Sequence, residues 1–412
     1  MKHPLLIAGL LGFSTLLHTA SAAPRKSGVT SPSLGTQYIY IEPNNVTVVA
    51  PQYLYTGAGL LTQNGTTTDV VYGTTSPEVV TEQVVDGQIA TLTASNNYAT
   101  GGKFTVAKVT DANPVCTLRL AGDPPKNALG VPLKANQYAY AAGTQPVTYY
   151  VLVTAGKMTG EFFSVQGNTA DTLLIYTAGV SVSAKDIKAV NLLPYWSLSS
   201  LFPASQANIA FIPTTDPSNV MTKLVINPPV ILGPQLPQVV GKSYYFSASL
   251  GAWVSVDNPS VPAGDTVLPP GGYIYFQNTG SVSFPLRVFI SGSALVDPFK
   301  FYLTSMKTVS TASTFALPRN TPYSINEMGF NNSNFAQSRG TDSSQRKDEL
   351  IVDDGHGGVA AIYYRYKNKW YNTDSPVPVT PVFAPGTAFG VKKPANNKGE
   401  HNVLLINQSN LK

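Results

Sequence analysis

The sequence predicts an all-β protein with more than one domain. Apolar and polar residues alternate with a period of two in short runs such as Lys103–Val106, Thr117–Leu120 and Tyr273–Phe276, and Gly, Pro, Asn or Asp clusters bound these runs. The 34 Gly and 32 Pro residues leave few windows for long helices. Charged residues make up only 12 % of the chain, whereas ordinary soluble domains carry roughly 25 %. Short strands with frequent turns are typical of β-sandwiches and small barrels.

The first residues have the pattern of an export signal. Lys2 gives a basic start, and Pro4–Leu17 is an apolar run too short to span a bilayer. Ala20-Ser21-Ala22 supplies the small residues of a cleavage site. We therefore predict a signal peptide at residues 1–22, with an uncleaved anchor as the alternative, and a flexible N-terminus at 23–35. The predicted destination is the extracellular space, the cell surface or the periplasm. No later run predicts a transmembrane segment.

Chain length predicts a division after the leader, because single cores usually stop growing at ~250–300 residues. Residues 36–193 read as an N-terminal β region, either a small barrel or a sandwich. Within it the runs Thr148–Val153, Glu161–Val165 and Asp171–Tyr176 form a meander that can close a small barrel. Residues 194–412 read as a C-terminal β domain.

The C-terminal domain contains two related halves, at about 220–292 and 346–408, which predict a duplicated β-sandwich. Each half has an apolar strand, a Tyr-Tyr strand, a Trp strand, a Pro-Gly turn and a final apolar strand. In chain order these are Leu224–Ile226, Tyr244-Tyr245, Trp253, Pro270-Gly271 and Val288–Ile290, then Leu350–Val352, Tyr363-Tyr364, Trp370, Pro385-Gly386 and Leu404–Ile406. The Tyr-Tyr and Trp strands are close enough in sequence to form hairpins.

Three shorter segments complete the prediction. Ser197 opens a single helical turn over Leu198–Phe202, which Pro203 ends. A second short helix is predicted over Ala184–Val190. The Asn/Ser/Gln-rich segment Phe330–Arg346 lacks any periodicity, and we predict that it forms an exposed, mobile loop between the halves.

From Tyr149 to the C-terminus the chain resembles a paralogous family of exported, uncharacterised proteins from verrucomicrobial-type bacteria. The resemblance implies export and an all-β fold, but the family has no known activity or catalytic residues to transfer. The matching elements are Tyr149-Tyr150, Gly160–Phe163, Asn168–Leu173, Pro194–Leu198, Leu201–Pro203, Asp348–Val352 and the two Tyr-Tyr, Trp and Pro-Gly units.

The sequence predicts neither an enzyme nor a cofactor. Zinc-protease spacing and a nucleophile elbow are absent from it, and Cys116 has no second cysteine with which to pair, so we expect a buried free thiol. The net charge of +5 is too weak to predict a nucleic-acid partner. Asp353-Asp354-Gly355-His356 has the groups of a metal or acid–base site, but Asp-Gly and Gly-Gly are also favoured in hairpin turns. We favour the turn and predict no metal.

Four aromatic residues are the candidate binding residues, namely Tyr244, Trp253, Tyr363 and Trp370. Flat rings can stack on sugars, although packing in the core is the more common role of aromatic residues in strands. Because adjacent strand residues point to opposite faces, one tyrosine of each pair should face outward unless both faces are covered.

Two functions agree with these observations. The first is an exported, non-enzymatic structural or surface-adhesive protein that acts through its β-sheet surfaces, with further copies of itself as partners in an oligomer or filament. The alternative is a carbohydrate- or polymer-binding accessory protein that uses exposed aromatics on a surface polysaccharide.

Overall fold

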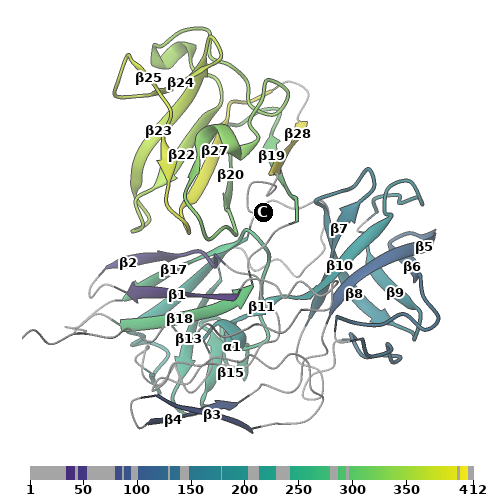
Figure 1. Ribbon diagram of the computed structural model, residues 1–412. Coiled ribbons are helices and arrows are strands. Elements are labelled where there is room, and N and C mark those ends of the chain that lie inside the picture. Colours follow the sequence, from purple (N-terminus) through teal and green to yellow (C-terminus); the bar gives the residue numbers. More distant parts are fainter. Residues whose placement is uncertain are drawn as a thin grey trace, which may run out of the picture. The chain divides into compact units, whose positions relative to one another are not determined.

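The computed structural model is built almost entirely of strands (Figure 1), which confirms the predicted all-β multidomain fold. It describes residues 34–41, 45–52, 79–85, 88–93, 101–128, 130–139, 148–177, 179–202, 213–228, 242–278, 286–293, 297–396 and 400–406. The predicted signal peptide lies outside the described residues, and so does the predicted flexible N-terminus up to residue 33. Strand β1 begins at Leu34, two residues before the predicted domain limit.

Six strands close a barrel in the order β10-β5-β6-β9-β8-β7. The predicted meander supplies three of them, and the barrel is therefore confirmed. Buried residues alternate with partly exposed ones along β6, β9 and β10, because one face of each strand fills the barrel and the other faces outward. The strands are β5 Gly102–Ala112, β6 Val115–Leu120, β7 Tyr149–Ala155, β8 Phe162–Asn168, β9 Thr172–Tyr176 and β10 Ala189–Pro194.

Strand β7 departs from this alternation because both of its faces are covered. Tyr149, Val151 and Val153 belong to the cluster that fills the barrel. Tyr150 and Leu152, which point the other way, belong to a second cluster that includes Phe299. The continuous apolar run of β7 is thus explained by burial against two cores.

The first β unit pairs a six-stranded sheet, in the order β15-β14-β13-β12-β17-β2, with the two-stranded sheet β1-β18. Their facing side chains form one core cluster around Ile41, Leu224, Trp253 and Phe276. The elements of the first β unit are β1 Leu34–Ile41, β2 Val46–Val49, β11 Trp196–Ser197, α1 Leu198–Leu201, β12 Thr222–Asn227, β13 Ser243–Ser247, β14 Ala252–Ser255, β15 Asn258–Pro262, β16 Val267–Leu268, β17 Tyr273–Asn278 and β18 Leu286–Ser293.

The second β unit has a six-stranded sheet in the order β20-β27-β22-β23-β24-β25, together with the two-stranded sheet β19-β28. Its core contains Phe301, Leu350, Trp370 and Phe389. Its elements are β19 Phe299–Ser305, β20 Thr311–Ala316, β21 Tyr323–Ser324, the 3-10 turns η1 Ile325–Met328 and η2 Ser343–Gln345, β22 Glu349–Asp353, β23 Val359–Tyr366, β24 Lys369–Asn372, β25 Pro378–Val379, β26 Val382–Phe383, β27 Ala388–Lys393 and β28 Glu400–Ile406.

The two β units have the same order of elements. In each unit, four consecutive strands form a meander, β12 to β15 in the first and β22 to β25 in the second. A later strand, β17 or β27, pairs with the first strand of the meander. An earlier strand, β2 or β20, pairs with the other side of that later strand and forms the edge of the sheet. The short pairs β11-β16 and β21-β26 are also equivalent. A capped helical turn follows β11 and β21, and the turn at Ser197 is confirmed as predicted.

This pairing differs from the predicted division of the chain. β1 and β2 fall in the predicted N-terminal region, yet they pair with β18 and β17 of the first β unit. The barrel and the hairpin of β3 (Val79–Val85) and β4 (Gln88–Thr93) therefore lie, along the sequence, between two parts of that unit. Strand pairing across so long a separation leaves no periodic signal in the sequence.

Two local predictions are wrong. Residues 184–190 form a turn followed by the start of β10, because Asp186 accepts hydrogen bonds from the Ser183 amide and hydroxyl and holds the chain in a turn. The segment Phe330–Arg346 is not simply exposed, since Asn334, Phe335 and Ser338 are buried in it.

Candidate functional site

The second β unit contains a polar cavity of about 480 Å³, which we call the polar hollow. Amide, hydroxyl and charged side chains line most of it. Its volume falls within the range of ordinary small-molecule sites. The lining residues are Ser305, Asn332, Ser333, Asn334, Phe335, Ala336, Gln337, Lys347, Asp348, Lys393, Pro394, Ala395 and Asn396.

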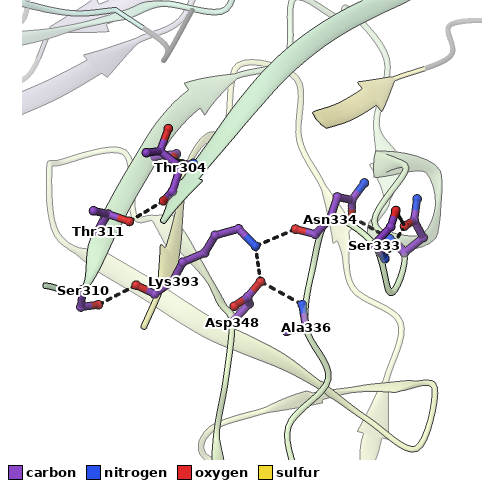
Figure 2. A network of polar contacts seen from close by, with 10 residues as sticks. Thr304, Ser310, Thr311, Ser333, Asn334, Ala336, Asp348 and Lys393 are labelled. Carbon is purple, nitrogen blue, oxygen red and sulfur yellow. Dashed lines mark hydrogen bonds and ion pairs between the residues drawn. The ribbon is translucent and has the colours of Figure 1, made fainter. Parts of the chain in front are cut away.

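A buried ion pair between Lys393 and Asp348 borders the polar hollow (Figure 2). Leu350 of β22 pairs with Val391 of β27, and both are core residues. Asp348 lies two residues before Leu350 and Lys393 two residues after Val391, so in these antiparallel strands both point to the same face as the core. They are only 3 % and 4 % exposed, respectively. The charges therefore continue a row of apolar side chains.

The polar contacts of the pair come from one loop. Lys393 Nζ donates to Asp348 Oδ2 and to the Asn334 carbonyl oxygen, at 2.7 Å from the latter. The amide of Ala336 donates to the same Asp348 Oδ2 at 2.8 Å. These contacts give both charged groups hydrogen bonds to the backbone of the loop. A buried ion pair needs such bonds to offset its loss of hydration.

The loop that supplies these contacts is held by its own asparagines. Asn334 Oδ1 accepts from the Asn331 amide at 2.8 Å, and Asn334 Nδ2 donates to the Gly329 carbonyl at 3.1 Å. Phe335, next in sequence, is fully buried with its ring centroid 5.1 Å from that of Trp370. The loop is thus fixed by local hydrogen bonds and an apolar anchor, although its composition favoured an unstructured linker.

Strands β19 and β20 support the end of β27 at which Lys393 lies. Ser310 Oγ donates to the Lys393 carbonyl at 2.9 Å, and the Thr304 amide donates to Ser313 Oγ at 2.9 Å. Thr311 Oγ1 donates to the Thr304 carbonyl (Figure 2). Hydroxyl groups on these strands therefore bind backbone groups around the ion pair.

The first β unit has a neutral pair at the equivalent place. Leu224 pairs with Phe276 as Leu350 pairs with Val391, so Thr222 and Asn278 correspond to Asp348 and Lys393. Thr222 Oγ1 donates to Asn278 Oδ1 at 3.4 Å, and both residues are buried. The sheet therefore forms without charges at this position.

The structure places the four predicted aromatic residues mainly in the cores. Trp253, Tyr244 and Trp370 are buried, and Tyr363 is half-buried against the core of the second β unit. Trp253 Nε1 also donates to the Phe202 carbonyl at 2.8 Å. Their burial favours the core-packing interpretation, because a buried ring offers no face to a sugar.

In both tyrosine pairs the stated exception to an outward-facing tyrosine applies. Tyr245 and Tyr364, the second members, are also buried. Tyr245 packs with Val220 and Val254. The Tyr364 ring stacks on Tyr371. Both faces of each sheet are therefore covered at these tyrosines.

The Asp353-Asp354 loop is the predicted hairpin turn between β22 and β23. Asp353 Oδ1 accepts from the Gly355 amide at 2.7 Å, and Asp354 Oδ1 accepts from the His356 amide at 2.7 Å. Burial raises the pKa of Asp353, whereas the amide donors lower the pKa of Asp354. In the described ranges, no three His, Cys, Asp or Glu residues gather closely enough to hold a metal ion.

Cys116 lies buried in β6, and burial raises the pKa of its thiol to about 11. This agrees with an unreactive thiol. Sequence reasoning missed Lys393 and Asp348 as a pair. The one available signal was the alternation Phe389, Val391, Lys393, which puts a lysine in line with two core residues.

Comparison with family models, curated proteins and solved structures finds no match for this chain. The resemblance to a verrucomicrobial family, and the export that it implies, therefore stay predictions. Within the described parts of the chain, none of the helices has the length and apolar character that crossing a membrane requires.

Proposed function

We propose that this is an exported, non-enzymatic structural or surface-adhesive protein that acts through the surfaces of its two β units. The observation that carries this proposal is the recurrence of one order of elements in both units. We infer that the two are copies of one ancestral unit, and that the barrel was inserted into the first copy. Duplication of a β unit is a common way to build extended scaffolds, in which surfaces rather than a reactive centre do the work.

The exposed strand edges indicate which kind of surface is used. Pro259 and Pro262 lie in the edge strand β15, and Pro378 lies in the edge strand β25. Proline cannot donate to a strand ladder and is typical of edges protected against pairing. We therefore expect copies of the chain to associate through side-chain faces rather than by adding strands to these edges.

Exposed valines of the second β unit are the apolar groups available for such contact. Val377 and Val382 are 61 % and 66 % exposed, near the edge strand β25. Light scattering and negative-stain images of the secreted chain should show assemblies that grow with concentration. A Val377→Ser/Val382→Ser variant should weaken them, whereas Val131→Ser, at an exposed valine in the connection between β6 and β7, should not. A monodisperse monomer at high concentration contradicts the proposal.

The polar hollow favours a second candidate, an accessory protein that binds polysaccharide. Its amides and hydroxyls suit sugar hydroxyl groups, and its described lining residues carry one more cation than anion, which favours an acidic polymer. Retention on insoluble neutral and acidic polysaccharides tests this candidate. Asn332→Ala/Gln337→Ala should abolish retention, while Trp253→Ala should lower stability and leave retention unchanged. Equal retention of all variants contradicts the candidate.

A further inference from the structure

We propose that Lys393 and Asp348 form an intramolecular isopeptide bond, an amide that joins the side chains beside the ends of β27 and β22. Nζ of the lysine already donates to Oδ2 of the aspartate, so the two reacting groups are in contact in the folded chain. Proximity of this kind removes the entropic cost of bringing a nucleophile to a carboxyl group. The proposal does not depend on the proposed function.

Burial distinguishes this pair from an ordinary salt bridge. The side chains of Lys393 and Asp348 are 6 % and 4 % exposed, respectively. A buried ion pair contributes little net stability, because both charges lose their hydration. The first β unit forms the same sheet with Thr222 and Asn278 at these positions. The fold therefore has no need of the charges, and a covalent product gives a reason for them.

The reaction balances without any other reactant. Nζ, after passing a proton to the carboxylate, attacks Cγ of Asp348, and the N–C bond forms. The bond from Cγ to Oδ1 breaks, and its electron pair leaves with the oxygen. Oδ1 takes both protons that the ammonium group loses on becoming an amide N–H, and it departs as one water molecule.

The surrounding groups suit each part of this step. The Ala336 amide donates to Oδ2, which becomes the amide carbonyl oxygen, so it stabilises negative charge that develops there. The Asn334 carbonyl accepts from Nζ at 2.7 Å and keeps the amine in position. The polar hollow beside the pair gives the departing water a polar space to enter.

The same two strands provide an internal control. Glu349 and Lys392, the neighbouring residues, pair across β22 and β27 with 2.9 Å between Nζ and Oε2. They point to the other face of the sheet, and the Lys392 side chain is 51 % exposed. Water solvates the ammonium group of Lys392, so this pair should remain ionic.

Intact-mass measurement of the purified, denatured wild-type chain tests the proposal. The mass should be about 18 Da below that of the sequence from its measured N-terminus, the mass of one water. Proteolysis should yield one branched peptide that joins Lys393 to Asp348. Lys393→Arg and Asp348→Ala should restore the full mass, and Lys392→Arg should keep the deficit.

The Asp348→Asn variant sharpens the test, because an asparagine would lose ammonia and give a deficit of about 17 Da instead. A wild-type mass equal to that of the sequence overturns the proposal, and so does a cross-link that maps to Lys392 and Glu349. Because the decisive mass is that of the wild-type chain, poor folding of a variant cannot obscure the result.

Discussion

The first and second β units have the same strand order in their main sheets. They differ in the pair of buried residues that lies next to the equivalent core pairs Leu224–Phe276 and Leu350–Val391. The first places the neutral pair Thr222 and Asn278 there, and the second places Asp348 and Lys393. All four residues are buried. The comparison shows that the strand order does not require charge at this place. The ion pair and the polar hollow are therefore features that the second unit has in addition to its fold.

The largest effect should come from leaving one of the buried charges alone. Lys393→Met leaves the buried Asp348 carboxylate without its lysine, which costs about 3–5 kcal/mol of unfolding free energy, and it also removes the proposed amide bond. The double variant Asp348→Thr/Lys393→Asn, which copies the first unit, should lose less than either single change. Calorimetric unfolding measures both. Lys392→Met is the exposed control, and a loss there equal to that of Lys393→Met contradicts the role of burial.

The next largest effect should come from substituting the glycine of the Pro-Gly turn in each unit. Gly271 and Gly386 both have a left-handed backbone, with φ of 78° and 79°, which costs about 1–2 kcal/mol for any other residue. A Cβ on Gly271 would also lie 2.1 Å from the Phe301 ring, whereas on Gly386 the nearest atom is Gln52 Nε2 at 3.1 Å. Gly271→Ala should therefore lower the melting temperature more than Gly386→Ala, by overpacking of about 1–3 kcal/mol. Equal shifts would mean that the Phe301 ring moves aside freely.

The two tryptophans provide a smaller contrast. Trp253 Nε1 donates to the Phe202 carbonyl, so Trp253→Phe removes a buried hydrogen bond, at a cost of about 0.5–1.5 kcal/mol. Trp370 packs against Phe335, and the Arg365 guanidinium lies over its ring. Trp370→Phe should keep most of that packing. Urea unfolding followed by circular dichroism compares the two variants. A larger loss for Trp370→Phe contradicts this assignment.

The sequence predicts the local parts of this fold better than the long-range ones. Alternation identified the barrel meander, and Ser197 and Pro203 marked the limits of the capped turn. Pairing of β1 with β18 could not be predicted, because the partners are far apart in the chain and each reads only as an apolar run. Lys393 was missed for a different reason. A lysine at a strand end is usually solvated, and only the register with Asp348 makes it buried.

The smallest effect should come from the hairpin turn that follows β22. There, one substitution gives the second unit the residue that the first unit has at the equivalent position. Asp353 follows β22 residue Val352 as Asn227 follows Ile226, so Asp353→Asn installs the equivalent residue. Asn Oδ1 can still accept from the Gly355 and Gly357 amides. We expect a change in unfolding free energy within about 0.5 kcal/mol at neutral pH.

The difference in unfolding free energy between Asp353→Asn and the wild type should depend on pH, and its direction can be predicted. Because burial raises the pKa of Asp353 above 3.8, the folded chain binds a proton more readily than the unfolded chain. The wild type therefore loses stability as the pH rises from about 3.8 through the folded pKa, and the asparagine variant does not. The difference between variant and wild type should grow in favour of the variant between acid and neutral pH. The opposite trend, or a large fall in melting temperature reversed by a divalent cation, would show that the loop binds a metal and is more than a turn.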